Sequence, residues 1–215
     1  MSGRSYVHGY TEREAERLRD QAETLSGLLH GDTRYPPGSR VLEAGCGTGA
    51  QTVILARNSP EARITSVDIS EASLGEARKR VLAEGLTNVT FEAGDIFDLP
   101  YEPGSFDHIF VCFVLEHLAE PHRALERLRP LLREGGTITV IEGDHGSAYF
   151  HPDSPCARRA IGCLIDLQRE AGGNALIGRE LYPLVAGAGY RDVHVSPRMV
   201  YADASRPDLV HGFTR

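Results

Sequence analysis

The chain has 215 residues, of which 41% are hydrophobic and 25% charged, and its formal net charge is −7. This length and composition fit one globular domain with a substantial core. The acidic balance, without a lysine/arginine run, argues against a nucleic-acid or anionic-membrane partner. The longest apolar run, residues 109–115, is too short to span a bilayer, and residues 1–10 lack the apolar stretch of a signal peptide. We therefore expect a cytoplasmic protein.

In chain order, the first predicted element is a helix that begins at Thr11 and runs to about His30. Glu14 stands at the capping-box position relative to Thr11, and leucine and alanine then recur at helical spacing. Residues 35–38, which read YPPG, end this element.

Strands and helices then alternate. The pattern predicts strands at 40–43, 63–67, 89–92, 106–113 and 137–142, and helices at 52–57, 70–84 and 121–133, the last ended by Gly135 and Gly136. Ser70 is expected to cap its helix, and Gly85 to follow that helix as its C′ residue. Such alternation predicts an α/β fold, Rossmann-like and doubly wound, with a mainly parallel sheet flanked by helices. Residues 106–113 are almost wholly apolar and should form a central strand.

After the fifth strand the pattern is less regular. A polar loop at 144–155 precedes predicted helices at 156–171 and 178–188, and a sixth strand is expected at 191–195. Residues 199–201 could be a remnant of a further strand, and residues 205–210 look like the start of a helix. Four cysteines (Cys46, Cys112, Cys156 and Cys163) contain no Cys-x-x-Cys pair, so we expect reduced, mostly buried thiols and no metal site.

The strongest motif is the run VLEAGCGTGA at residues 41–50, which follows a strand and opens a helix. Its alternate glycines, Gly45, Gly47 and Gly49, let the backbone approach a ligand closely, and the helix behind them presents free N–H groups to an anion. That anion could be a pyrophosphate or a carboxylate. The same run satisfies the weak dinucleotide pattern G-x-G-x-x-A, so an NAD-dependent oxidoreductase is an alternative.

Three carboxylates near this loop favour a different ligand. Glu43 lies inside the loop, Asp68 ends the second strand and Asp95 follows the third, so all three are expected at one edge of the sheet. A ring of carboxylates suits a sulfonium, an ammonium group, a ribose diol and an adenine amine, which S-adenosyl-L-methionine (SAM) combines. Asp68 would accept hydrogen bonds from the ribose and Asp95 one from the adenine, with Ile96 against the ring.

The order of motifs resembles the class I SAM-dependent methyltransferases. The resemblance covers residues 40–142: E-x-G-x-G-x-G from Glu43, an acidic end to strand two, Gly-Asp after strand three, SFDHIFV at 105–111 with LEHL at 115–118, and LLREGG at 131–136. It is nearest to small-molecule enzymes of the ubiquinone/menaquinone-biosynthesis type. It implies that the backbone at Cys112 and Phe113 lines the methionine end of the cofactor. The predicted cofactor-binding residues are Glu43, Gly45, Cys46, Gly47, Gly49, Asp68, Ile69, Asp95, Ile96, Cys112 and Phe113.

The acceptor is harder to assign because methyl transfer from a sulfonium requires a base only when the acceptor must first lose a proton. His117 and His145, which follow the fourth and fifth strands, are the candidate catalytic residues, although His117 could simply pack locally. His151 is expected at the surface. The candidate substrate-binding residues are Tyr6, Tyr10, Glu116, Asp144 and Tyr149. The fourth strand lacks the Asn/Asp-Pro-Pro-Tyr/Phe segment of amide and nucleobase methyltransferases, which favours a small-molecule acceptor.

The expected organisation is an N-terminal helical lid at 1–38 and a SAM-binding methyltransferase domain at 39–215, with a substrate-loop insert at about 143–188. The resemblance implies a seven-stranded sheet, yet no convincing final strand follows residue 195, so the C-terminal edge could be incomplete. An unpaired edge favours association, and a homodimer is possible. A non-catalytic SAM-binding subunit is a further alternative.

Overall fold

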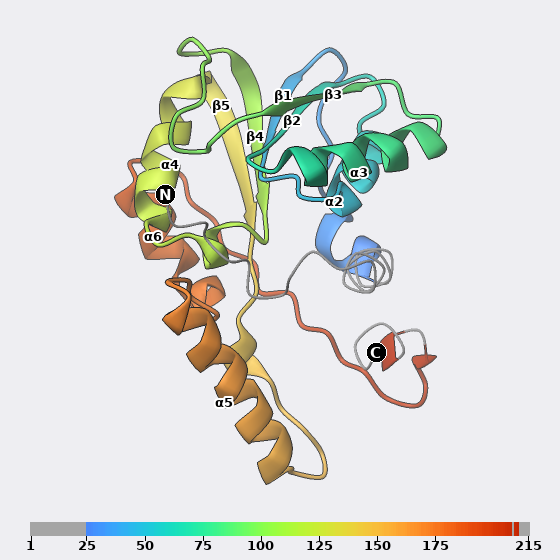
Figure 1. Cartoon of the computed structure of the whole chain (residues 1–215), viewed down its shortest axis with the longest axis vertical. Coiled ribbons are helices and arrows are strands. Elements are labelled where there is room, and N and C mark those ends of the chain that lie inside the picture. The colour runs from blue at the N-terminus through green and yellow to red at the C-terminus, as the bar shows by residue number, and fades with distance from the viewer. Residues whose placement is uncertain (1–24, 208, 211–215) are drawn as a thin grey trace.

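Five strands form one sheet in the order β3-β2-β1-β4-β5, and every neighbouring pair is parallel (Figure 1). The computed structural model describes residues 25–207, 209 and 210. The strands are β1 (Arg40–Ala44), β2 (Arg63–Asp68), β3 (Val89–Ala93), β4 (Phe106–Cys112) and β5 (Leu132–Ile141). The predicted doubly wound, mainly parallel α/β fold is confirmed.

The order of the strands reverses between β1 and β4. From β1 the chain proceeds outward through β2 to β3, and it then crosses back to β4 and β5 on the other side. The loops that leave the carboxyl ends of β1 and β4 therefore diverge. In open α/β sheets this is the position at which ligands bind.

Helices and short 3₁₀ turns connect the strands. The described elements are α2 (Ala50–Asn58), α3 (Glu71–Ala83), η1 (Leu115–His117), α4 (Pro121–Leu128), η2 (Arg129–Leu131), η3 (His145–Ser147), α5 (Pro155–Glu170), η4 (Ile177–Glu180) and α6 (Leu181–Gly187). Residues 25–30 are also helical. The hydroxyl of Ser70 accepts a hydrogen bond from the N–H of Ser73 and so caps α3, as predicted. Gly85 adopts a positive φ of 67° after that helix, as expected for its C′ residue.

Alternate residues of the central strands build the core on two faces of the sheet. In β4, Ile109 and Val111 pack with residues of α4 and α6, whereas Phe110 and Cys112 pack on the opposite face with residues of α2. This follows from the two-residue period of a strand. The predicted central position of residues 106–113 is confirmed, because β4 pairs with β1 on one side and β5 on the other.

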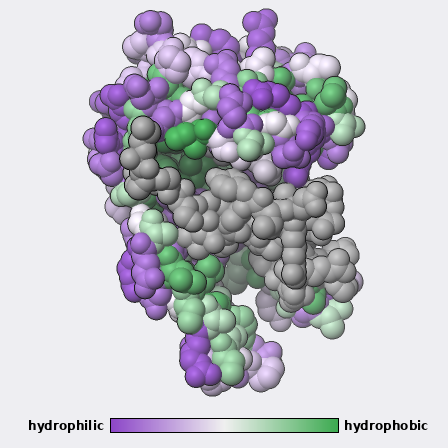
Figure 2. Space-filling model, viewed as in Figure 1, coloured by the Kyte–Doolittle hydropathy of each residue, from purple (hydrophilic) through white to green (hydrophobic). Residues whose placement is uncertain are grey.

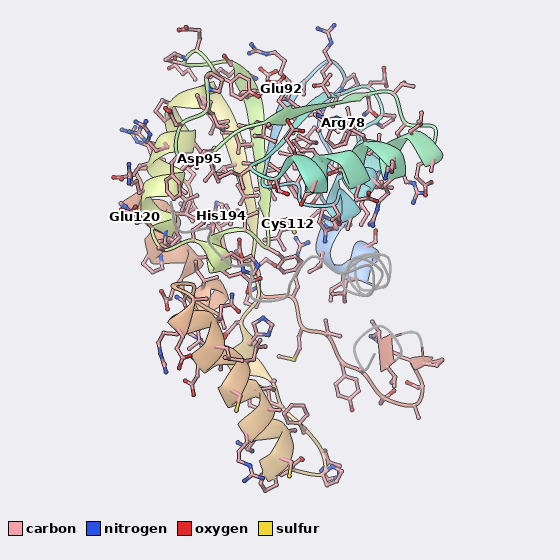
Figure 3. The ribbon with its side chains drawn as sticks, viewed as in Figure 1. Arg78, Glu92, Asp95, Cys112, Glu120 and His194 are labelled. Carbon is pink, nitrogen blue, oxygen red and sulfur yellow. The ribbon has the colours of Figure 1, made fainter. Side chains whose placement is uncertain are left out.

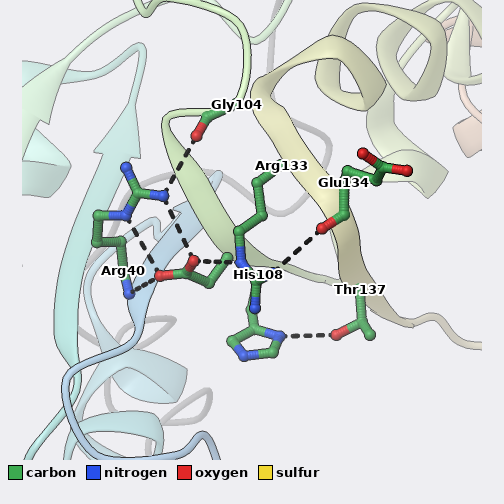
Figure 4. Close-up of polar contacts among 7 residues, drawn as sticks. Arg40, Gly104, His108, Arg133, Glu134 and Thr137 are labelled. Atoms are coloured by element: carbon green, nitrogen blue, oxygen red, sulfur yellow. Dashed lines mark hydrogen bonds and ion pairs between the residues drawn. The ribbon is translucent and has the colours of Figure 1, made fainter.

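The amino ends of the strands are tied together by Asp107. Its carboxylate accepts hydrogen bonds from the backbone N–H of Arg40 (2.7 Å) and from Nε of Arg133 (2.5 Å), as Figure 4 shows. Next to it, Nδ1 of His108 lies 2.8 Å from Oγ1 of Thr137. These contacts join β1, β4 and the start of β5 at the edge of the sheet opposite the glycine loop.

The helix predicted at 121–133 is shorter than expected. It ends at Leu128, and β5 begins at Leu132, so that Gly135 and Gly136 lie inside a strand. The physical reason is Pro130, which has no N–H to donate and clashes with a continuing helix. The two glycines form an irregularity in the pairing of β4 with β5, where Phe106 pairs with Leu132 but His108 pairs with Thr137.

The predicted sixth strand at 191–195 is wrong. Within the described residues no strand follows β5, although Val193 packs against the core. Asp192 has a φ of +52°, which interrupts an extended run, and the hydroxyl of Tyr190 instead donates to the carbonyl of Leu125. Residues 199–201 form no strand either. The segment predicted as one helix at 178–188 divides into η4 and α6, and helical structure begins at Pro207.

Helix α5 extends away from the sheet (Figure 1). In Figure 2 hydrophilic residues lie along one side of this projection and apolar residues along the other. Cys156 and Cys163 are exposed on it, whereas Cys46 and Cys112 are buried, so only two of the four free thiols are inside. In the part of the chain that the structure describes, no helix is both long and apolar enough to cross a bilayer.

Candidate functional site

The glycine loop between β1 and α2 is bound to the end of β2. The N–H groups of Gly45 and Cys46 both donate to the carbonyl of Val67, at 2.8 and 3.0 Å. The N–H of Gly47 donates to Oδ2 of Asp68 at 2.8 Å. Three hydrogen bonds thus attach the loop to the end of the neighbouring strand.

The glycines of this loop serve two different purposes. A Cβ on Gly49 would lie 2.8 Å from Cβ of Ala77, so this glycine is required for packing against α3. Apart from its chain neighbours, a Cβ on Gly47 would meet no atom of the described residues within 4 Å, although its φ of +53° also favours glycine. Among the described residues, therefore, nothing prevents a ligand from approaching the backbone at Gly47 closely.

Asp68 and Asp95 lie beside each other at the same edge of the sheet. Asp68 is the last residue of β2 and pairs with Ala93, two residues before Asp95. Asp68 is half-buried and also accepts the N–H of Ser70 (2.9 Å), and the exposed Asp95 accepts the N–H of Phe97 (3.0 Å). Each carboxylate keeps acceptor capacity for a ligand.

Apolar groups stand next to these two carboxylates. Ile69 is 72% exposed, and Ile96 is half-buried against the core. An exposed isoleucine directly after a strand-end carboxylate suits a ligand that has both a polar rim and a flat apolar face, as a nucleoside does. The structure therefore brings together Asp68, Ile69, Asp95 and Ile96.

The expected position of Glu43 is wrong. It lies in β1 rather than in the loop and is only 2% exposed, with Oε2 accepting hydrogen bonds from Ser66 (2.5 Å) and Thr52 (2.7 Å). Burial raises the pKa of Glu43 to about 7. Strand alternation turns Glu43 towards α2, so its carboxylate lies beneath the loop. Of the three predicted carboxylates, only Asp68 and Asp95 remain available to a ligand.

The end of β4 meets the glycine loop from the other side. Figure 3 shows Cys112 at the carboxyl end of β4, and the next residue, Phe113, has a φ of +54° and donates its N–H to Ile141 (2.9 Å). A Cβ on Gly45 would lie 2.5 Å from Cγ2 of Val114. Burial raises the pKa of both Cys46 and Cys112, so these residues are neutral thiols.

Glu116 is the centre of a second polar cluster. It is 6% exposed; its Oε2 accepts a hydrogen bond from Nε2 of Gln168 (3.0 Å) and lies 3.6 Å from Nε2 of His145. Nε2 of His117 lies 3.7 Å from Oε1. Burial alone would raise the pKa of Glu116, but His145, His117 and Gln168 hold it below its usual value. The structure thus brings together the candidates Glu116, His117 and His145 around an ionised carboxylate.

Two residues of this cluster were not predicted from the sequence. Gln168, in α5, is fully buried and also donates to the backbone carbonyl of Glu116 (3.1 Å). Glu142 directly follows β5, and its Oε1 accepts the N–H groups of Val114 (2.9 Å) and Leu115 (2.7 Å). A charged residue at the end of an apolar strand was a usable signal for Glu142, whereas nothing in the helical pattern distinguishes Gln168.

The remaining substrate candidates do not join this cluster. Asp144 is held by Arg179 in a bidentate pair (2.8 and 2.9 Å) and also accepts Ser147 Oγ (2.6 Å), so its carboxylate fixes the loop after β5 onto η4. Tyr149 is 83% exposed, and His151 is exposed as predicted. Tyr6 and Tyr10, together with most of the expected lid, lie outside the described residues.

Within residues 25–207, 209 and 210, no group of three His, Cys, Asp or Glu side chains could hold a metal ion. The polar groups are instead arranged in two sets along one edge of the sheet. Asp68 and Asp95 stand beside the glycine loop, and the Glu116 cluster stands after β4 and β5. Together with the parallel sheet, the glycine loop beside Asp68 and Asp95 is the arrangement that the resemblance to the class I SAM-dependent methyltransferases implied.

The comparison with protein families agrees with the geometry. A family model described as a methyltransferase domain matches residues 36–171, and the chain belongs to this family. The predicted methyltransferase class is thereby confirmed.

Curated relatives and solved structures are consistent with this family. The chain is 36% identical over 199 residues to an uncharacterized 37.1 kDa protein in transposon TN4556 of Streptomyces fradiae, covering 91% of this chain and 56% of that protein. It is 31% identical over 120 residues to a demethylmenaquinone methyltransferase of Symbiobacterium thermophilum, covering 55% of this chain and 48% of that protein. The chain thus spans about half the length of these relatives.

The crystal structure of a SAM-dependent methyltransferase from Aquifex aeolicus has the same fold. Its TM-score is 0.63 at 19% identity, covering 85% of this chain and 90% of that one.

Proposed function

We propose that this protein binds SAM at the glycine loop and transfers its methyl group to a small-molecule acceptor. The observation that carries the proposal is the pair formed by Gly47 and Asp68: an open backbone position tied to a strand-end carboxylate. Relatives named for methylation of small molecules, such as demethylmenaquinone and 27-O-demethylrifamycin SV, support the acceptor class.

The residues around the loop fit the chemical groups of SAM. Asp68 would accept hydrogen bonds from the ribose hydroxyls and Asp95 one from the adenine amine, with Ile69 and Ile96 against the ring. The backbone N–H groups after Gly47 would hold the methionine carboxylate at the start of α2. The buried Glu43 would support the loop from below through Thr52. When bound, SAM supplies an activated methyl group.

The Glu116 cluster is the proposed acceptor side. Its position after β4 and β5 places it at the same edge of the sheet as the glycine loop. Ionised Glu116 would orient His145 and His117, and either imidazole could take a proton from an acceptor hydroxyl or amine. Asp144 contributes indirectly by holding the loop that carries His145.

A thermal-shift and calorimetric comparison of SAM, S-adenosyl-L-homocysteine and NAD tests the proposal. A ligand present at 100 times its Kd stabilises a protein by about 2.7 kcal/mol, which for a chain of this size raises Tm by about 5–10 °C. We expect this response to SAM and its homocysteine product but not to NAD. A response to NAD alone would refute the proposal.

Catalysis is tested by release of S-adenosyl-L-homocysteine in the presence of phenols, alcohols, amines, thiols and carboxylates. Turnover that depends on one of these compounds supports an enzyme. Tight SAM binding without turnover on any of them would favour a non-catalytic SAM-binding subunit.

A further inference from the structure

Glu142 is arranged differently from the other carboxylates near the site. One of its oxygens, Oε1, accepts two backbone N–H groups, from Val114 and Leu115. The other oxygen, Oε2, is buried and has no hydrogen-bond partner among the described residues. A buried carboxyl oxygen without a partner costs free energy, and this distinguishes Glu142 from the other carboxylates near the site.

The two N–H groups belong to the turn that leads from β4 to the acceptor side. Phe113 turns the chain with a positive φ, and η1 then carries Glu116 and His117. The N–H groups at the start of such a turn have no partner within it and require an external acceptor. The N-cap residue of η1, Val114, makes no side-chain cap, and Glu142 supplies the acceptor from β5.

We infer that Glu142 is a positioning residue, which from the end of β5 holds the turn that presents Glu116 and His117 to the acceptor. Its role in methyl transfer rests on the proposed function. Its hold on the turn does not, because that depends only on the two hydrogen bonds.

The charges that face Glu142 give this role a pH dependence. Cys112 faces it from β4 as a neutral thiol, and Glu116 faces it from η1 as an anion that His145 and His117 accompany. Burial, reinforced by the charge of Glu116, raises the pKa of Glu142 to about 8. At pH 7 Glu142 is therefore mostly protonated, and because Oε1 accepts the two N–H groups, the proton resides on Oε2.

A second negative charge would appear next to Glu116 as the pH rises through about 8. Below this pH the turn is held by a neutral acid, and Glu116 is the single anion of the pair. Above it the two carboxylates repel each other within a buried site. We therefore expect the electrostatic environment of Glu116 and of the turn to change when Glu142 ionises.

The test uses Glu142→Gln, which keeps an oxygen for the two N–H groups but cannot ionise. In the full chain with S-adenosyl-L-homocysteine, the carboxyl ¹³C resonance of Glu116 is followed by NMR from pH 6 to 9. We expect an inflection near pH 8 in the wild type that Glu142→Gln lacks. Glu134→Gln, an exposed change on β5, is the matched control and should keep it. An unchanged Glu116 titration in Glu142→Gln would overturn the inference.

Amide hydrogen exchange of Val114 and Leu115 tests the hold on the turn. We expect exchange at least about tenfold faster in Glu142→Ala and nearly unchanged in Glu142→Gln, because only alanine removes the acceptor. Equal protection in Glu142→Ala and the wild type would refute the positioning role. If Glu142→Ala does not fold, Glu142→Asp, whose shorter side chain cannot reach both N–H groups equally, replaces it with the same criterion.

The two proposals can fail separately. If the protein does not bind S-adenosyl-L-homocysteine, the proposed function fails, yet the titration and exchange experiments still decide the role of Glu142 on the free protein. Once an acceptor is known, Glu142→Gln should alter the pH profile of kcat above pH 7 and leave the KM for SAM within about twofold.

Discussion

The carboxylate of Asp68 accepts a hydrogen bond from the N–H of Gly47 over 2.8 Å. This bond joins the last residue of β2 to the middle of the loop after β1, across 21 residues of sequence. The neighbouring strand, rather than a side chain within the loop, therefore supports Gly47, and the described residues leave space above it.

Replacing Asp68 with alanine should weaken cofactor binding. The change removes the support of Gly47 and the proposed acceptor for the ribose. Hydrogen bonds to charged groups contribute about 1.5–3 kcal/mol, so the Kd for S-adenosyl-L-homocysteine should rise about 10- to 100-fold in calorimetry. Asp98→Ala is the control, since the Asp98 side chain is 91% exposed. Equal affinity of Asp68→Ala and the wild type would contradict the assigned role.

Alanine at Gly47 and at Gly49 should have different effects. Both backbones have positive φ, which costs about 1 kcal/mol for alanine. At Gly47 the new methyl group enters open space, so Tm should fall by only about 2–4 °C while the affinity for S-adenosyl-L-homocysteine falls at least about tenfold. At Gly49 the methyl group collides with Ala77, which should cost about 2–4 kcal/mol of stability.

Thermal unfolding with and without S-adenosyl-L-homocysteine separates the two glycine variants. The prediction for Gly47 is wrong if its alanine variant binds as the wild type does. The prediction for Gly49 is wrong if its alanine variant is as stable as the Gly47 variant.

The buried Glu43 should make stability fall as the pH rises. Its pKa is about 7 in the folded protein, above the ordinary value of 4.5, so the folded state binds more protons between these limits. The stabilisation is complete below about pH 4.5 and is lost by about pH 7, a change on the order of 3 kcal/mol. Urea unfolding at pH 5 and pH 7.5 should show a smaller loss for Glu43→Gln than for the wild type.

Glu142, with a pKa of about 8, adds a similar pH dependence of stability to the wild type and to Glu43→Gln. Only the difference between these two proteins therefore reports on Glu43. Glu134→Gln should follow the wild type. Identical pH dependence in Glu43→Gln and the wild type would mean that Glu43 does not hold a proton in the folded state.

The Asp107 contacts should have the opposite pH dependence. Hydrogen bonds from Arg40, with a contribution from Arg133, hold the pKa of Asp107 well below its usual range. The stabilisation is therefore present above about pH 4 and is lost as the pH falls further. Because both arginines are about half exposed, we expect Asp107→Asn to cost only about 1 kcal/mol, or about 2–4 °C in Tm, at pH 7.

This difference should shrink when unfolding is repeated between pH 4 and pH 2, where the wild-type carboxylate begins to take up its proton. Asp166→Asn, at an exposed pair within α5, is the control. A difference between Asp107→Asn and the wild type that stays constant with pH would show that Asp107 acts through packing or backbone hydrogen bonding rather than through its charge.

The alternation of strands and helices as far as β5, the parallel sheet, the glycine loop and the carboxylates near the carboxyl ends of β2 and β3 were predicted from the sequence alone. Each depends on local spacing: the two-residue period of strands, the cap at Ser70, and glycines between a strand and a helix. Parallel strands also place their carboxyl ends at one edge, so the neighbourhood of Asp68 and Asp95 followed without knowledge of tertiary contacts.

Only the tertiary structure decided which way Glu43 points and which side chains surround Glu116. Glu43 lies beneath the loop because a hydroxyl of α2 and one of β2 cover its face of the strand. Gln168 and Glu142 contact the turn after β4 from segments 52 and 27 residues away in sequence. Such contacts depend on tertiary packing, which sequence periodicity does not predict. Asp192, the second residue of the predicted strand at 191–195, likewise adopts a positive φ that breaks the extended backbone, a conformation that the local pattern did not indicate.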